Sequence, residues 1–184
     1  VVIGILAGYI TGGRLKWLIQ RQLRWSALVI AAFLIQLVIF SDIPFLKLSS
    51  SAVVIFHAVT YVCLIVFIVV NLKVKGMLLV GIGIFLNALV IFLNGGYMPT
   101  IPKNLLNTSA GRTAQSIAQG DAVHNSAGMT SRTLLPWLGD IFYLPSWIPM
   151  SNVFSIGDIL VAIGICVYLA ANMRPVENHK STGA

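Results

Sequence analysis

Long apolar runs constrain this chain more than any other feature. Five of them stand out, at about residues 1–13, 25–40, 52–72, 76–93 and 153–173. A helix needs about 20 residues to cross the ~30 Å hydrocarbon core of a bilayer, with a range of about 17–25. The last three runs reach that length, the second is slightly short and the first is shorter still. The sequence therefore predicts an all-α fold, a polytopic membrane helix bundle of about five transmembrane helices that forms one membrane domain over residues 1–184.

The scarcity of charge supports this class. Charged residues make up 9% of the chain and apolar residues 58%, whereas a soluble domain carries about 25% charged residues. The net charge of +7 does not indicate nucleic-acid binding, because the charges lie in short clusters between apolar runs and no basic arm or nucleic-acid module is present. The expected partners are membrane lipids, with a membrane protein or a second copy of the chain as further options, and no nucleic acid.

The placement of lysine and arginine predicts the orientation, because cytoplasmic loops carry an excess of these residues. With the N-terminus outside, eight of the twelve lie inside and four outside. The inside set is Arg14, Lys16, Arg21, Arg24, Lys73, Lys75, Arg174 and Lys180. The outside set is Lys47, Lys103, Arg112 and Arg132. We therefore expect a multi-pass protein of the cell membrane with its N-terminus outside and its C-terminus in the cytoplasm.

Two features near the N-terminus predict contacts of their own. Gly4, Gly8 and Gly12 form a small-residue stripe that lets another helix approach closely, within the bundle by preference or across a dimer. The stretch 14–25, RLKWLIQRQLRW, has apolar residues near one helical face and basic residues largely elsewhere. It is typical of a basic helix on the inner leaflet, although an ordinary positively charged loop fits equally well.

The longest polar segment, 94–152, lies on the predicted outer face, and we call it the outer segment. Its second half carries aromatic residues broken by prolines, and aromatic side chains favour the depth of the lipid headgroups. We expect a short helix and turns that fold back over the bundle, since a structureless loop of this length is uncommon.

Catalytic and cofactor motifs are absent from the sequence, so we expect no catalytic residues, no cofactor and no metal. Asp121 and His124 in the polar segment could bind a metal, but two ligands at arbitrary spacing are weak support.

Polar residues at membrane depth are the informative ones, because such positions are costly and are satisfied inside the bundle. Helical spacing places several of them near the outer ends of their helices. Together with one carboxylate of the outer segment, they are the candidate ligand-binding residues: Gln36, His57, Asn87, Asn94, Asp140 and Asp158. They would line an outward-facing polar cup beneath the outer segment. The alternative is that they serve as interhelical hydrogen bonds, and for Asp158 that it caps a helix through the Ser155-x-x-Asp158 spacing.

The order of four short motifs resembles a known family. These motifs are Gly12-Gly13-Arg14, the run 94–99 (NGGYMP), Leu138-Gly139-Asp140 and Ser155-Ile156-Gly157-Asp158. Their order is similar to a bacterial family of small multi-pass membrane proteins, the domain of unknown function 5317. The resemblance covers nearly the whole chain and implies a bacterial inner-membrane protein, but it implies no activity. It gives added weight to Asn94, Asp140 and Asp158 as site residues.

Three functions remain open on this sequence. The first is a non-enzymatic accessory subunit or an outer-leaflet binder of a lipid or small ligand, which suits the missing catalytic motifs. The second is a small transporter component. Two observations argue against it: no charged residue lies in the middle of a predicted span, and no internal repeat is visible. The third is a membrane enzyme acting on a lipid, which requires His57, Asp140 and Asp158 to converge on one position.

Overall fold

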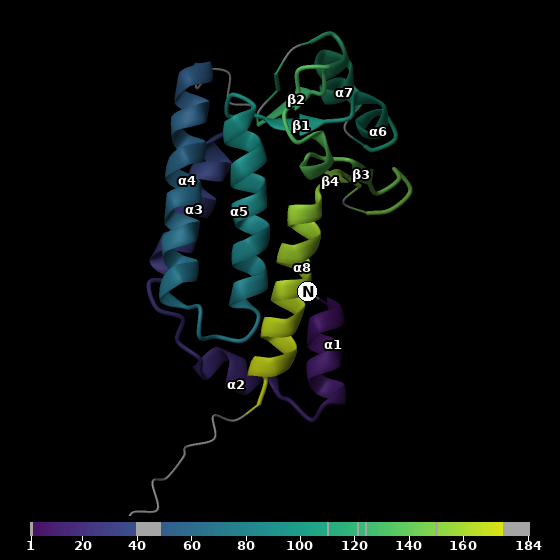
Figure 1. Ribbon diagram of the computed structural model, residues 1–184. Coiled ribbons are helices and arrows are strands. Elements are labelled where there is room, and N and C mark those ends of the chain that lie inside the picture. The colour runs from purple at the N-terminus through teal and green to yellow at the C-terminus, as the bar shows by residue number, and fades with distance from the viewer. Residues whose placement is uncertain are drawn as a thin grey trace, which may run out of the picture.

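Helices dominate the structure, a computed structural model that describes residues 2–39, 49–109, 111–120, 122–123, 125–149 and 151–174. Each of the five apolar runs contains one helix (Figure 1). These helices are α1 (Val2–Ile10), α3 (Ala27–Ile39), α4 (Ser50–Val70), α5 (Met77–Leu93) and α8 (Ile156–Asn172). The short helix α2 (Leu15–Gln20) lies within the basic stretch, across the lower end of the bundle.

The lengths of these helices bear directly on the predicted membrane spans. Residues Ser51–Val70 of α4 form a helix that is long and apolar enough to cross a bilayer, the one such helix among the described residues. Helices α3, α5 and α8 are apolar but have 13, 17 and 17 residues. The nine residues of α1 extend only about 14 Å at ~1.5 Å per residue. A mostly helical fold with one candidate span is established, while five crossings remain a prediction.

Glycines set the packing of α1 on α8. A Cβ on Gly4 would lie 2.7 Å from the Cα of Cys166, and one on Gly8 would overlap the side chain of Met173. Gly12 has nothing within 4 Å, and Gly13 takes its place against Met173. The glycine stripe therefore packs within the monomer, but its third member is Gly13, because the helix has already ended at Ile10.

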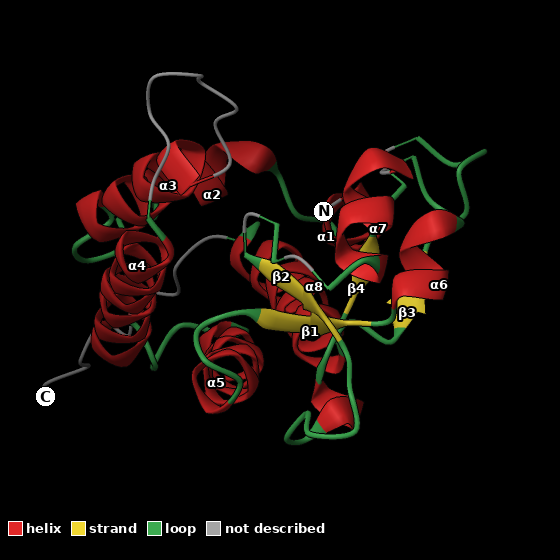
Figure 2. Ribbon diagram, turned by 90° about the horizontal axis from the view of Figure 1, so that it is seen from above, coloured by secondary structure: helices red, strands yellow, loops and turns green. Residues whose placement is uncertain are grey.

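The bundle has two parts, with α3 packed on α4 and with α8 packed between α5 and α1 (Figure 2). A core cluster of Phe67 and Ile68 from α4 with Met77 and Val80 from α5 joins the two parts. A second cluster joins the outer end of α5 to the segment above it through Val90, Ile91, Met98 and Leu138. The outer segment consequently covers the ends of α5 and α8, whereas α4 ends beside it (Figure 1).

The outer segment corrects the all-α prediction. It contains α6 (Pro102–Leu106), α7 (Gly111–Ala118) and a 3₁₀ turn, η1 (Pro136–Leu138), together with short β-strands. Strands β1 (Met98–Thr100) and β2 (Ser126–Gly128) pair in parallel, and β3 (Phe142–Tyr143) pairs antiparallel with β4 (Val153–Phe154). Prolines and glycines interrupt any helix here, and extended backbone must pair its N–H and C=O groups once it is buried. These strands hold residues from distant parts of the segment next to the bundle.

Candidate functional site

Three polar side chains meet where the outer end of α5 crosses the start of α8. Asn87 donates from Nδ2 to Asp158 Oδ1 at 2.8 Å. The Ser155 hydroxyl lies 2.9 Å from both Asn87 Oδ1 and Asp158 Oδ2, and its single proton can be donated to one of them at a time. No side chain is tolerated at Gly157 in this arrangement, because a Cβ there would overlap the Asn87 amide.

Asp158 also caps its own helix, as its spacing from Ser155 predicts. The Asp158 backbone N–H donates to Ser155 Oγ at 3.0 Å, and the Ser155 N–H donates to Asp158 Oδ2 at 2.9 Å, which is a capping box. Asp158 nevertheless remains exposed. The carboxylate is therefore held by the protein from one side and open to a cavity on the other.

Asp140 lies in the outer segment and is buried, with 8% of its surface exposed. Thr100 donates from Oγ1 to Asp140 Oδ2 at 3.1 Å, and the Asp140 backbone N–H donates to the carbonyl of Pro99 at 2.8 Å. Burial and, to a smaller extent, the negative charge of Asp158 raise the pKa of Asp140 to about 7, although the hydrogen bond from Thr100 lowers it. Asp140 is consequently able to exchange a proton near neutral pH.

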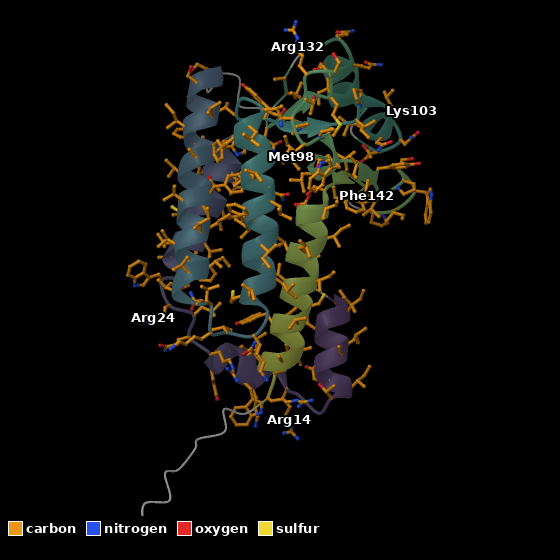
Figure 3. The ribbon with its side chains drawn as sticks, viewed as in Figure 1. Arg14, Arg24, Met98, Lys103, Arg132 and Phe142 are labelled. Atoms are coloured by element: carbon orange, nitrogen blue, oxygen red, sulfur yellow. The ribbon has the colours of Figure 1, made fainter. Side chains whose placement is uncertain are left out.

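These groups open onto a polar cavity of about 330 Å³ between the bundle and the outer segment. Its volume falls within the range of ~300–1,000 Å³ that is usual for ligand sites. Figure 3 shows the labelled Met98, one of its lining residues, between the top of α5 and the outer segment. The lining residues are Tyr61, Asn87, Ile91, Met98, Leu105, Asn125, Ser126, Asp140, Asn152, Val153 and Asp158.

A second cavity, of about 720 Å³, lies within the helix bundle and is mostly apolar. Residues of α3, α4, α5 and α8 line it, from Met77 near the lower end of α5 to Asn87 near the upper end. Ten residues of helix separate these two, which is about 15 Å. Tyr61, Asn87 and Asp158 line both cavities, so the polar and apolar spaces meet at these three side chains.

The structure thus brings three of the six sequence-predicted residues together, Asn87, Asp140 and Asp158, around the polar cavity. Gln36 lines the apolar cavity, where its Oε1 is buried and has no hydrogen-bond partner in the described part of the chain. The predicted single cup is therefore divided into two spaces. The reason is that Gln36 lies on α3, which packs on α4 (Figure 2).

Asn94 does not join the other predicted residues. Its Nδ2 donates to the carbonyls of Val90 and Leu134 at 2.8 and 2.9 Å, and its Oδ1 accepts from the Leu134 N–H at 2.8 Å. These bonds cap the C-terminal end of α5 and hold Leu134 of the outer segment against it. Asn94 lines a separate pocket of about 170 Å³ and is not among the residues that line the polar cavity.

His57 is buried in the bundle, with 1% of its surface exposed. Neither ring nitrogen has a hydrogen-bond partner among the described residues, and the ring stacks on Tyr61 with 6.4 Å between centroids. His57 therefore makes no interhelical hydrogen bond within the described part of the chain. His57 is also not among the residues that line the cavity of Asp140 and Asp158, so the three groups do not converge as an acid–base site would require.

Several lining residues lie outside the sequence-predicted set. Tyr61 is one turn from His57 on α4, and an isolated tyrosine in an apolar helix is most simply a packing residue. Asn125 and Asn152 lie in the polar segment, where amides are common. Only the pairing of β1 with β2 brings Asn125 to the end of α5, and no sequence signal identifies that pairing.

No group of three or more histidine, cysteine, aspartate or glutamate side chains gathers within the described part of the chain. Asp121 and His124, the two weak metal candidates, fall outside it.

Comparison with known proteins defines the family of this chain. The searches of curated proteins and of solved structures gave no match. The model of a family of unknown function, DUF5317, matches residues 20–170, which include α3, α4, α5, most of α8 and the whole outer segment. The chain belongs to this family of unknown function, DUF5317.

Proposed function

We propose that this protein is a non-enzymatic, multi-pass membrane protein that binds a lipid-like amphiphile from the outer leaflet. The observation that carries the proposal is the pair of neighbouring cavities, one polar and one apolar, whose linings share Tyr61, Asn87 and Asp158. A headgroup would occupy the polar cavity, and an apolar chain would follow the bundle beneath it.

A lipid environment is supported by what the helices expose. Large apolar side chains on their outer faces are more than half exposed, whereas water-soluble proteins rarely expose such continuous apolar surface. Examples from three helices are Phe33 at 60%, Val62 at 60% and Phe85 at 57%. Acyl chains would cover these faces at no cost, and the α-helix satisfies its backbone hydrogen bonds internally, as a bilayer requires.

The distribution of charge supports the proposed orientation. The basic residues of the described part gather at the end of the bundle where α2 lies, and Figure 3 shows Arg14 and Arg24 there, with Lys103 and Arg132 at the opposite end. The two described acids, Asp140 and Asp158, belong to the latter end. The positive-inside rule then makes the α2 end cytoplasmic and the outer segment external. Helix α1 runs toward the α2 end (Figure 1), the direction required by an N-terminus outside.

The chemistry of the two cavities favours an amphiphile over a small polar solute. A solute that used only the polar cavity would leave the apolar space without an occupant. Each methylene group buried in such a space contributes about 0.8 kcal/mol. An amphiphile would fill both spaces, and the shared residues would lie at the level where its headgroup meets its chain.

The test blocks the apolar cavity without touching the polar one. Leu64 lines the apolar cavity, whereas Val62 is on the same helix, 60% exposed and outside the lining. We expect the full-length protein, gently solubilised and studied by native mass spectrometry with lipid extraction, to retain a specific amphiphile. Leu64→Trp should reduce that retention about tenfold, a change of ~1.4 kcal/mol. Val62→Trp is the matched control and should retain it fully.

Two results would overturn the proposal. One is a retained lipid composition that matches the bulk membrane. The other is equal retention by the two tryptophan variants at equal thermal stability. A stoichiometric protein partner recovered in place of any lipid would instead support an accessory subunit, with the polar cluster acting as interhelical hydrogen bonds.

A further inference from the structure

The polar cavity offers hydrogen-bonding groups of both kinds. In the described part of the structure, Thr100 provides the only side-chain hydrogen bond to Asp140, at Oδ2, and Asp140 lines the cavity, so Oδ1 is left as an acceptor for a ligand. The amide of Asn125 accepts from Ser126 through Oδ1, and that of Asn152 accepts from the Val153 N–H through Oδ1. Neither Nδ2 group has a described partner, so both remain as donors.

The cavity has no cationic side chain in its described lining, although the chain as a whole carries a net charge of +7. It has two acidic groups, those of Asp140 and Asp158. A phosphate placed beside them would add negative charge next to the Asp158 carboxylate, with no counter-ion from the described lining. The lining therefore disfavours a phosphate-bearing headgroup.

An ammonium headgroup matches only half of the lining. It carries donors and no acceptor, so it would bind Asp140 but could not accept from the Nδ2 groups of Asn125 and Asn152. A hydroxyl group both donates and accepts, and several hydroxyls on one ring can meet the carboxylate and the two amides together.

We infer that the polar cavity selects an uncharged, polyhydroxylated headgroup, so that the ligand of this site is a neutral glycolipid-like amphiphile. The inference rests on the proposed function, because it names the chemical class that the neighbouring cavities would accept. Asp140 would accept from a headgroup hydroxyl, and Asn125 and Asn152 would donate to others.

The experiment compares headgroups on identical acyl chains. The full-length protein is placed in phosphatidylcholine nanodiscs that contain equal small fractions of monoglucosyl-diacylglycerol, phosphatidylglycerol and phosphatidylethanolamine. Native mass spectrometry then measures which lipid stays bound after release from the disc. We expect the glucosyl lipid to be enriched about tenfold over each phospholipid, which corresponds to ~1.4 kcal/mol.

Variants assign the selectivity to the cavity. Asn152→Leu and Asn125→Leu each remove one free donor, and each should lower the enrichment severalfold while phospholipid binding stays constant. Asn152 is exposed, so its replacement is the less disruptive of the two. Arg132→Ala changes the same outer segment outside both cavities and should leave the enrichment unchanged.

The outcomes separate this inference from the proposed function. Equal binding of all three lipids that is abolished by Leu64→Trp would refute the headgroup selectivity and leave the amphiphile site in place. Preference for phosphatidylglycerol or phosphatidylethanolamine would also refute the selectivity. Binding of none of the lipids, with no effect of Leu64→Trp, would refute both.

Discussion

Replacing Asp140 with asparagine tests the electrostatics of the site most directly. The asparagine side chain has nearly the same shape and keeps an oxygen that can accept from Thr100, but it cannot ionise. In the native protein, burial and the neighbouring charge of Asp158 raise the pKa of Asp140 from 3.8 to about 7. The unfolded chain has no such environment, so the folded protein holds this proton more tightly than the unfolded one does.

The sign of the pH dependence follows from that difference. Between about pH 4 and pH 7 the folded state binds more protons than the unfolded state, so the free energy of unfolding falls as the pH rises. The stabilisation is complete below the unfolded pKa of 3.8 and is lost as the pH passes through the folded value of about 7. A pKa difference of about 3 corresponds to roughly 4 kcal/mol. Because the cavity admits water beside Asp140, this figure is an upper bound.

The assay is unfolding of the purified protein in detergent micelles at a series of pH values from 4 to 8, with wild type and Asp140→Asn side by side. Taking the difference between the two proteins cancels the titration of every other group. We expect nearly equal stability at pH 4 and a more stable Asp140→Asn protein at pH 8, by up to about 4 kcal/mol. A constant difference across the range would show that Asp140 titrates as an exposed carboxyl does, and the argument from burial would be wrong.

Two further substitutions probe the packing around the site. Gly157→Ala would force a methyl group onto the Asn87 amide, and overpacking of this kind costs about 1–3 kcal/mol, so thermal unfolding should move to lower temperature and amphiphile retention should fall with it. Unchanged stability would contradict the close approach of α5 and α8. Asn94→Ala removes three hydrogen bonds, including both to Leu134, and should cost roughly 2–3 kcal/mol at about 1 kcal/mol each. Because Asn94 lines neither of the two neighbouring cavities, amphiphile retention by the folded fraction should be unchanged, and a selective loss of retention would restore Asn94 to the binding site.

The positions of the long helices could be predicted because each apolar run is bounded by local signals. Asn94 followed by glycines ends α5, and Ser155 with Asp158 begins α8 within one residue of where their spacing indicates. The interior of the outer segment could not be predicted in the same way. Its strands have two or three residues each and pair across up to 28 positions of sequence, as Met98 does with Ser126, so no local periodicity identifies them.

Members of the candidate site could be predicted only where the depth of a residue along its helix was enough to place it at the site. Asn87 and Asp158 are both near the outer ends of their helices, and those two helices are neighbours, so the two side chains meet. The depth of a residue along its helix does not determine the direction in which its side chain points around the helix axis. His57 and Gln36 have suitable depths, yet His57 is buried with no hydrogen-bond partner among the described residues, and Gln36 lines the apolar cavity. Asn94 was predicted as a site residue from its depth as well, but its hydrogen bonds hold Leu134 of the outer segment against α5.

Interhelical bonding and ligand binding are not exclusive explanations of the polar cluster, because different atoms serve each. Both carboxylate oxygens of Asp158 already accept protein hydrogen bonds, one from Asn87 and the other at the start of α8. Replacing Asp158 would therefore disturb the helix junction whether or not a ligand exists, and loss of binding in such a variant would decide nothing. Asp140 keeps one oxygen without a described partner, and Asn152 keeps its amide donor. Substitutions of these two residues are therefore more informative about a ligand than substitution of Asp158, because their free atoms have no role in joining α5 to α8.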